Sequence, residues 1–307
     1  MSSSKAISAM RSTNVPPVFL EWPLASVIEG VVGRIEENHC EQISCGTDGD
    51  VYVLSTNRGR FILRLWANRE LASVRNEQLI LESLRDSGVE GVQEPYLLVN
   101  EHPSGGVAAI RRYIKGHAAE HITRSGVERL GRLLADLHQL PVPSEFEQRC
   151  HPWPRVPDGT FLDALAHNLR EFSPFCSEVK RRLRDQGVAD LPVSLVHDDI
   201  SLDNLIATAD SSIILIDWSD AHVDTSVSDI VVASSQLNLN YDQRDALIGA
   251  YEEIRSLSKD ERNVWPLLEA RRHLFILHYL QARGLPVSAQ RMECARVRCK
   301  RLLEANS

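Results

Sequence analysis

Apolar and polar residues in the first third of the chain follow a pattern that predicts an antiparallel β-hairpin. Two runs rich in β-branched and aromatic residues, 51–55 and 60–65, flank a turn at 57–59. A second turn, rich in Gly and Asp, covers residues 46–50 and precedes the first run. Glycine lets the backbone approach a neighbouring group closely, so this second turn could also lie against a ligand.

Two more apolar runs, 96–100 and 107–113, predict strands that extend the hairpin into a small sheet. Between the two pairs of strands, residues 76–85 carry apolar side chains at helical spacing, and Gly88 follows as a stop signal. The pattern therefore predicts an N-terminal lobe made of an antiparallel sheet and one helix.

Helical periodicity dominates after residue 123. Ser125 and Glu128 have the spacing of a capping box, and the helix they open is expected to end before Pro141. Five prolines between 141 and 157 predict an irregular connection. Further helical patterns cover residues 161–185, 227–238, 242–256, 261–283 and 287–304. The expected fold class is α+β, with a larger and mostly helical C-terminal lobe.

Composition narrows the functional classes. The 307 residues are 43% apolar and 25% charged, as in ordinary globular proteins. A net charge of −8 argues against a nucleic-acid surface, and no run of 18 apolar residues exists to span a membrane. Six scattered cysteines without a Cys-x-x-Cys pair favour a reducing, cytoplasmic location. The Ser-rich residues 1–13 are interpreted as a flexible tail.

Polar residues at the ends of two apolar runs carry the candidate chemistry. The first run leads into His197, Asp198 and Asp199, Asn204 follows, and the second run ends at Asp217. Phosphoryl transfer needs a carboxylate near the acceptor hydroxyl and oxygen ligands for magnesium, which this set supplies. Each piece alone has an ordinary explanation, a capped turn or an Asp at a strand end, but the combination favours catalysis.

The segment 197–204 (His-Asp-Asp-Ile-Ser-Leu-Asp-Asn) and the segment 216–218 (Ile-Asp-Trp) resemble the aminoglycoside phosphotransferase and choline kinase superfamily. Residues 131–138 are similar to its first large-lobe helix, and the likeness covers most of the chain. The resemblance implies a bilobal protein-kinase-like fold, with the N-lobe at 14–113 and the C-lobe at 114–307.

The resemblance also implies roles for individual residues. Asp199 would be the catalytic base, Asn204 and Asp217 would bind Mg²⁺, and His197 and Asp229 would brace the loop. Asp198 departs from the glycine that is usual in the family. Asp tolerates the left-handed backbone conformation better than most residues, so the loop can survive the change.

Nucleotide contacts are expected from the N-terminal lobe. Arg64 stands where kinases carry a phosphate-binding cation, and Glu77 is its candidate ion-pair partner. A solvated helix Glu is the competing interpretation of Glu77. The complete set of expected nucleotide-binding residues is Thr47, Gly49, Arg64, Glu77, Arg112 and Ile114.

Acceptor contacts are expected from Asp220 and Asp224, just beyond the catalytic segment, and from Glu269 and His273 on a late helix. The expected activity is transfer of the γ-phosphate of ATP or GTP, with Mg²⁺, to a hydroxyl of a small molecule. The segment 217–221 resembles the antibiotic-modifying branch of the superfamily, so antibiotic inactivation is favoured. A metabolic kinase for choline, homoserine or a similar alcohol is the alternative, and a non-catalytic nucleotide-binding protein is the third. A monomer or homodimer is expected.

Overall fold

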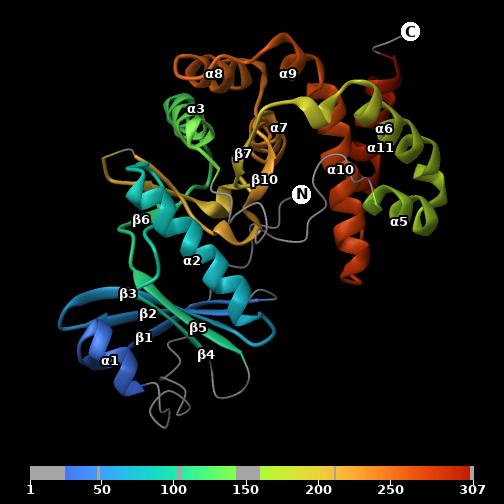
Figure 1. Ribbon diagram of the computed structural model, residues 1–307. Coiled ribbons are helices and arrows are strands. Elements are labelled where there is room, and N and C mark those ends of the chain that lie inside the picture. Colours follow the sequence, from blue (N-terminus) through green and yellow to red (C-terminus); the bar gives the residue numbers. More distant parts are fainter. Residues whose placement is uncertain (1–24, 47–48, 102–105, 143–159, 211, 305–307) are drawn as a thin grey trace. The chain divides into compact units, whose positions relative to one another are not determined.

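The computed structural model describes residues 25–46, 49–101, 106–142, 160–210 and 212–304. The chain divides into two compact units. The first consists of Met1–Arg85 with Glu94–Lys115, and the second of Asp86–Gln93 with Gly116–Ser307. The expected α+β class is confirmed, because the first unit is built on an antiparallel sheet and the second is mostly helical (Figure 1).

In its described residues, the first unit contains five antiparallel strands and two helices. The strand order is β1-β2-β3-β5-β4, and β2 and β3 form the expected hairpin. A helix that the sequence pattern did not reveal, α1, precedes the sheet. The elements are α1 (Ala25–Val32), β1 (Ile35–Gly46), β2 (Gly49–Thr56), β3 (Gly59–Trp66), α2 (Leu71–Asp86), β4 (Leu98–Glu101) and β5 (Val107–Arg112).

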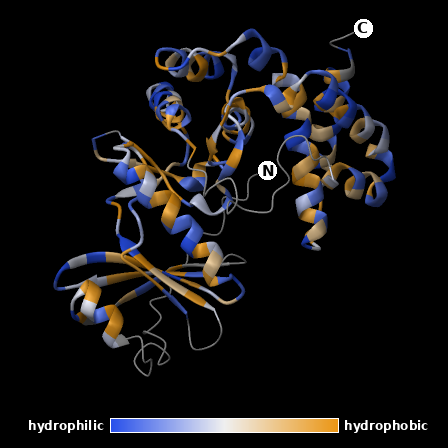
Figure 2. Cartoon of the chain, in the orientation of Figure 1, coloured by the Kyte–Doolittle hydropathy of each residue, from blue (hydrophilic) through white to orange (hydrophobic). Residues whose placement is uncertain are grey.

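Alternation along the strands builds the core of this unit. Leu54 on β2 faces Phe61 on β3, and both pack with Ile28 and Val32 of α1. Hydrophobic residues run along these central strands in Figure 2. These residues share one face of the sheet because side chains two residues apart on a strand point the same way, and Val53 and Ile62 on the other face are buried as well.

Gly49 opens β2 in a backbone conformation with φ +106°, which favours glycine. A Cβ atom there would lie 2.3 Å from the carbonyl oxygen of Leu65 on β3. The structure therefore gives Gly49 a packing reason for its identity, beside the nucleotide role expected from the sequence. Thr47, its neighbour in that expectation, lies outside the described residues.

The second unit has two small sheets and most of the helices. The strand pair is β10-β7 and the three-stranded sheet is β6-β8-β9. The strands are β6 (Gly116–Ala118), β7 (Val193–Val196), β8 (Leu205–Thr208), β9 (Ile213–Leu215) and β10 (His222–Thr225). The helices are α3 (Arg124–Gln139), α5 (Thr160–Asn168), α6 (Ser173–Asp185), α7 (Val227–Gln236), α8 (Tyr241–Glu252), α9 (Lys259–Asn263), α10 (Trp265–Ala282) and α11 (Ala289–Glu304).

Helix packing holds the strand ends of this unit in place. Helix α3 packs against α8 and β7, and α10 packs against α5, α7 and α11. The start of α3 corrects the capping box expected at Ser125. The N-cap is Thr123, whose hydroxyl accepts a hydrogen bond from the Gly126 amide, because the helix begins one residue before Ser125.

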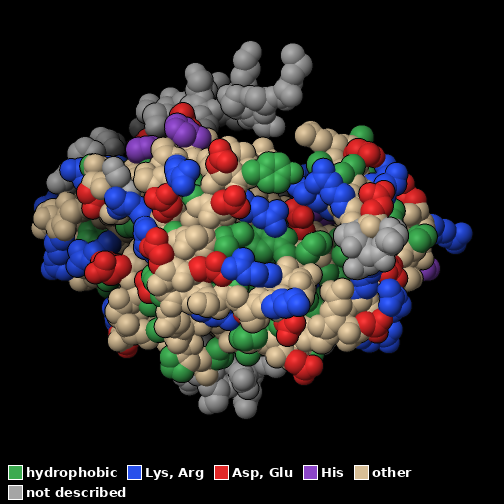
Figure 3. Space-filling view, turned by 90° about the horizontal axis from the view of Figure 1, so that it is seen from above, with side chains coloured by type: hydrophobic (Ala, Val, Ile, Leu, Met, Phe, Trp, Pro, Cys, Tyr) green, Lys and Arg blue, Asp and Glu red, His purple; other side chains and the backbone are tan. Residues whose placement is uncertain are grey.

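The surface carries both signs of charge. On the face seen in Figure 3, Lys and Arg side chains lie among Asp and Glu side chains. Within the described part of the chain, no helix is both long enough and apolar enough to cross a lipid bilayer.

Candidate active site

Residues 197–204, the candidate catalytic segment, follow the end of β7 at Val196 and begin with a tight turn. Asp198 adopts φ 60°, in the left-handed region that L-residues other than Asn and Asp rarely visit. An aspartate at this position is therefore compatible with the turn for which the resemblance implies a glycine. The backbone then passes Asp199 and reaches Asn204 just before β8 begins.

His197 is fully buried and braces the loop through both ring nitrogens. Its Nδ1 accepts a hydrogen bond from the Asp199 amide at 3.2 Å. Its Nε2 donates to the carbonyl of Ile216 at 3.1 Å, which fixes the tautomer. The ring also packs edge-on against Trp218, with centroids 4.7 Å apart. His197 therefore ties the two catalytic segments together.

Asp229, at the start of α7, holds the same loop from the other side. Its carboxylate accepts hydrogen bonds from the amides of His197 and Asp198, both at 2.8 Å. His138 lies 3.3 Å away and also contacts Tyr251. Burial alone would raise the pKa of Asp229, but His138 and these amides outweigh burial and lower it. The carboxylate is thus kept ionised where it orients the turn.

The Asp199 carboxylate is held by two amide side chains. Asn204 Nδ2 donates to one carboxylate oxygen at 2.8 Å and to the Asp199 carbonyl at 2.9 Å. Gln236, the last residue of α7, donates to the other carboxylate oxygen at 2.8 Å. Two donors that act on different oxygens fix the plane of the carboxylate. The residue expected as the base is therefore oriented before any substrate binds.

The β8–β9 ladder brings Asn204 and Asp217 to the same strand ends. Leu205 pairs with Leu215, and the Ile216 amide donates to the Asn204 carbonyl at 3.0 Å. Because Asn204 uses its amide nitrogen on Asp199, its amide oxygen points away and can accept a cation. An amide oxygen and a carboxylate are hard ligands that suit Mg²⁺. The donor set therefore fits this ion.

No group of three or more His, Cys, Asp or Glu side chains in the described ranges is placed to hold a metal ion. In phosphoryl transfer, proteins commonly bind Mg²⁺ through one or two side chains, and phosphate oxygens and water complete its shell. A site formed by Asn204 and Asp217 does not need a full protein cage.

The carboxylate of Asp220 lies within electrostatic range of three other carboxylates of the candidate site. Burial and the charges of Asp199, Asp198 and Asp217 raise its pKa to about 6, and Arg272 offsets part of this effect. Asp220 is therefore close to the candidate catalytic residues, and its contact with the acceptor stays a prediction.

Three other residues expected to contact the acceptor are engaged inside the protein. Asp224 is 3% exposed and pairs with Arg271 at 3.1 Å, so it is corrected to a structural residue. Glu269 pairs with Arg298 of α11 at 3.1 Å, and His273 contacts Ser235 at 3.4 Å. Burial and neighbouring arginines lower the pKa of His273 to about 4. The ion pair of Asp224 joins residues far apart in the sequence and leaves no local signal, and the acceptor roles of Glu269 and His273 stay predictions.

The first unit places the expected nucleotide residues on β3, α2 and the end of β5. The Arg64 guanidinium lies over the Trp66 ring, 4.9 Å from its centroid. The expected Arg64–Glu77 pair is replaced, because Glu77 pairs with Arg69 at 2.8 Å and accepts from Tyr96 at 2.7 Å. Arg69 reaches Glu77 from the turn that leads into α2.

At the end of β5, Arg112 is exposed and lies 3.8 Å from Glu94. Ile114 follows in the link that leads out of the first unit and is partly buried. Both were expected to offer backbone groups to the nucleotide base, and they keep that role as a prediction.

His222 on β10 gives a testable pH dependence. Burial alone would lower its pKa, but Asp224 and Asp198 outweigh burial and raise it from the ordinary value of 6.5 to about 9. A raised folded pKa means that the protonated ring contributes stability below pH 6.5, and that this contribution is lost as pH rises through 9.

We therefore expect His222→Gln to lower the free energy of unfolding at pH 6 by about 3 kcal/mol. The difference between the variant and the wild type should shrink toward pH ~9.5, because the His222 ring loses its proton as the pH rises through 9. Urea unfolding at both pH values measures this. An equal difference at the two pH values would show that His222 is neutral in the folded protein.

Comparison with known proteins supplies a family for this geometry. The model of the family described as "Phosphotransferase enzyme family" matches residues 39–262. A homoserine kinase of Methylocella silvestris is 26% identical over 243 residues, which cover 74% of each chain.

Two solved structures share the fold. An aminoglycoside phosphotransferase from Alicyclobacillus acidocaldarius has a TM-score of 0.64 at 13% identity, over 90% of this chain and 94% of that one. A choline/ethanolamine kinase family protein from Mesorhizobium loti has a TM-score of 0.64 at 20% identity, over 93% and 92%. These likenesses confirm the protein-kinase-like fold.

Proposed function

The chain belongs to the phosphotransferase enzyme family, and from this premise we propose that it moves the γ-phosphate of ATP or GTP to a hydroxyl group of a small molecule. The observation that carries the proposal is the Asp199 carboxylate, held by Asn204 and Gln236 at 2.8 Å each. A carboxylate fixed in this way is suited to accept a proton from a hydroxyl of defined position.

In the proposed reaction the acceptor oxygen attacks the γ-phosphorus and the bond between that phosphorus and the bridging oxygen breaks. The hydroxyl proton passes to Asp199, and the nucleoside diphosphate leaves. The hydroxyl becomes acidic only as its bond to phosphorus forms, so the proton is transferred to the carboxylate as the oxygen attacks. The protein mainly positions the reactants.

Asn204 Oδ1 and the Asp217 carboxylate would hold Mg²⁺. When bound, the ion would neutralise phosphate charge and help align the reacting groups. His197 and Asp229 keep the two ligand-bearing segments in register through their hydrogen bonds to the loop backbone and to Ile216.

Arg64 is proposed to bind the nucleotide phosphates. Arg64→Ala should raise the KM for the nucleotide about 10-fold or more while kcat changes less, because hydrogen bonds to charged groups contribute about 1.5–3 kcal/mol. Arg60→Ala is the matched control, since Arg60 lies on the same strand, is exposed and lies over Tyr113. An unchanged nucleotide KM in Arg64→Ala would leave Arg64 as a structural cation.

Two acceptor classes are supported by different observations. The homoserine kinases that match three quarters of this chain support a small metabolic alcohol. The segment 217–221 is similar to the antibiotic-modifying branch and supports inactivation of an antibiotic as the second candidate. A metabolic acceptor rests on the longer match and is the better supported of the two.

The test is phosphate transfer from ATP and from GTP, with Mg²⁺, to homoserine, choline, aminoglycosides and macrolides. Mass spectrometry would detect the added phosphate on each acceptor. A phosphorylated alcohol supports the metabolic function, and a phosphorylated drug supports the second candidate. Nucleotide binding without transfer to any acceptor would favour the non-catalytic alternative instead.

A further inference from the structure

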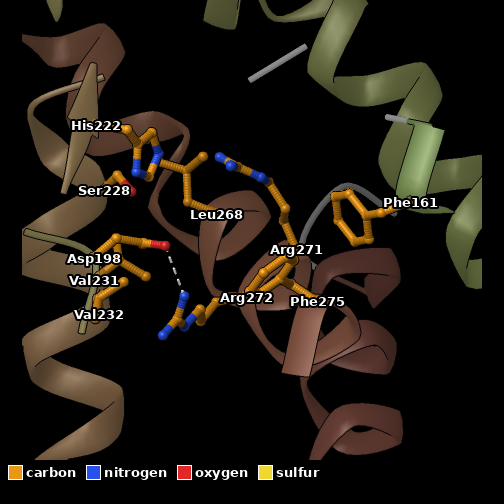
Figure 4. Close-up of a pocket in the computed structure, with 10 residues that line it drawn as sticks. All are labelled: Phe161, Asp198, His222, Ser228, Val231, Val232, Leu268, Arg271, Arg272 and Phe275. Atoms are coloured by element: carbon orange, nitrogen blue, oxygen red, sulfur yellow. Dashed lines mark hydrogen bonds and ion pairs between the residues drawn. The ribbon is translucent and has the colours of Figure 1, made fainter. Parts of the chain in front are cut away.

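A pocket in the second unit is lined by Asp198, the residue that precedes the candidate base Asp199 in the chain. Asp198 lines it from the catalytic loop, Arg272 and Phe275 from α10, Val231 from α7 and Phe161 from α5 (Figure 4). Asp199 follows Asp198 in the chain and does not itself line the pocket, but the charges of Asp199 and of Arg272 both act on Asp220, so the Asp199 carboxylate lies near the pocket. The pocket combines apolar walls with a few charged groups, as sites for small ligands commonly do.

Arg272 lines this pocket and has a hydrogen-bond donor that no described residue accepts. Its Nη1 pairs with Asp198 at 3.0 Å, and its guanidinium lies 5.5 Å from the centre of the Phe275 ring. The side chain is 11% exposed, yet its Nε is buried and has no hydrogen-bond partner among the described residues. A buried donor without a partner costs free energy unless a ligand supplies the acceptor.

The geometry of the guanidinium restricts what that ligand can be. The ion pair with Asp198 uses Nη1. The other edge of the guanidinium, formed by Nε and Nη2, takes no part in this ion pair. Two parallel N–H groups on such an edge match the two oxygens of a carboxylate. Asp198 and Phe275 fix the plane of the group, which reduces the entropy lost when an anion binds.

The surroundings of Arg272 add positive charge. Arg271 and His222 also line the pocket, and the raised pKa of His222 keeps its ring protonated at neutral pH. Asp198 is the lining carboxylate, and Asp224 lies behind Arg271. Asp220, whose carboxylate is within electrostatic range of Asp199 and Arg272, adds negative charge beside the pocket, so the preference for an anion rests on the donor edge of Arg272 itself.

We propose that this pocket binds the carboxylate of the acceptor through the Nε–Nη2 edge of Arg272. On this inference, which rests on the proposed function, the acceptor is a small hydroxy acid or hydroxy amino acid. The proposal also gives a role to Asp198, which stands where the family usually has glycine. Its side chain positions Arg272, and its backbone makes the left-handed turn.

The test compares acceptors that differ by one group. L-Homoserine carries a hydroxyl, an ammonium and a carboxylate. 3-Amino-1-propanol lacks the carboxylate, and 4-hydroxybutyrate lacks the ammonium. We expect the wild-type protein to have a kcat/KM at least about 10-fold higher for the two carboxylates than for the amino alcohol. Equal turnover of homoserine and aminopropanol would overturn the proposal and leave the phosphotransferase function standing.

Arg272→Gln should lower kcat/KM for both carboxylates about 10- to 100-fold, mainly through KM, and change that for aminopropanol less than about 3-fold. Arg272→Lys keeps a cation beside Asp198 but lacks the fork, so an intermediate loss is expected, and it serves if the glutamine variant does not fold. Arg283→Gln, an exposed arginine at the end of the same helix, is the matched control. Equal loss for all three acceptors in Arg272→Gln would contradict the assignment.

Calorimetric binding of 4-hydroxybutyrate and of homoserine, without nucleotide, separates this inference from the proposed function. Binding that Arg272→Gln weakens at least about 10-fold, with no phosphate transfer to any acceptor, would retain the carboxylate site and overturn the phosphotransferase function. If neither carboxylate binds the wild type in calorimetry or is turned over, the inference is wrong.

Discussion

Asp199→Asn is expected to lower kcat by at least about 10²-fold while nucleotide binding stays nearly intact. The asparagine has the same shape but cannot take the proton from the acceptor hydroxyl. It also disturbs its own position, because Asn204 and Gln236 both donate to the present carboxylate and an amide offers only one oxygen to accept. Steady-state kinetics with a phosphorylated acceptor, together with titration of the nucleotide, measure the two effects separately.

Asp203→Asn is the matched control for this experiment. Asp203 lies in the same loop, is exposed, and makes no side-chain hydrogen bond within the described residues. Its variant loses the same charge without touching the Asp199 carboxylate, so kcat should remain within about 2-fold of wild type. Near-wild-type turnover in Asp199→Asn would remove Asp199 as the base, and equal losses in both variants would point to a general charge effect.

Short sequence separation decided which parts of the site could be predicted. Asp199 and Asn204 are five residues apart and hydrogen-bond directly, so their spacing carries the geometry. Gln236 and Arg272 reach the same loop from α7 and α10, 37 and 74 residues away from their partners. Nothing local in the sequence marks either residue, since both sit in ordinary helical patterns. Only the packing of the helices brings them to the catalytic segment.

The same distinction explains the fold. The β2–β3 hairpin was predicted because its turn and its two apolar strands are contiguous in the sequence. Helix α1 was missed, because Ile28 and Val32 in so short a segment give little periodicity. Their burial against Leu54 and Phe61 becomes visible only in three dimensions. Tertiary packing overrides weak local preference in such cases.

Buried charge was the hardest feature to interpret from sequence. Asp224 follows the candidate catalytic motif closely and has the type of side chain that binds an amine. In the structure it forms ion pairs with Arg271 and His222 instead. A carboxylate can be buried only with such partners, because desolvation otherwise costs several kcal/mol. The partner arginine lies 47 residues away, so the sequence could not distinguish a ligand contact from an internal ion pair.

Asp217→Ala is expected to abolish turnover supported by Mg²⁺, because Asp217 is the carboxylate proposed to bind the ion. Asp217→Asn keeps an oxygen ligand and should retain part of the activity, with a higher Mg²⁺ concentration for half-maximal rate. Rates measured across a Mg²⁺ titration distinguish these outcomes. Asp203→Ala, which removes a neighbouring exposed carboxylate, should leave the Mg²⁺ requirement unchanged.

A double variant tests whether Asp217 and Asn204 act on one ion. If both residues hold the same Mg²⁺, removing the second after the first should cost much less than removing it from the wild type. Asn204→Ala also frees one oxygen of Asp199, so part of its effect should remain in the Asp217→Ala background. Fully additive losses would place Asn204 and Asp217 in separate functions, and an unchanged Mg²⁺ dependence in Asp217→Ala would move the metal site elsewhere.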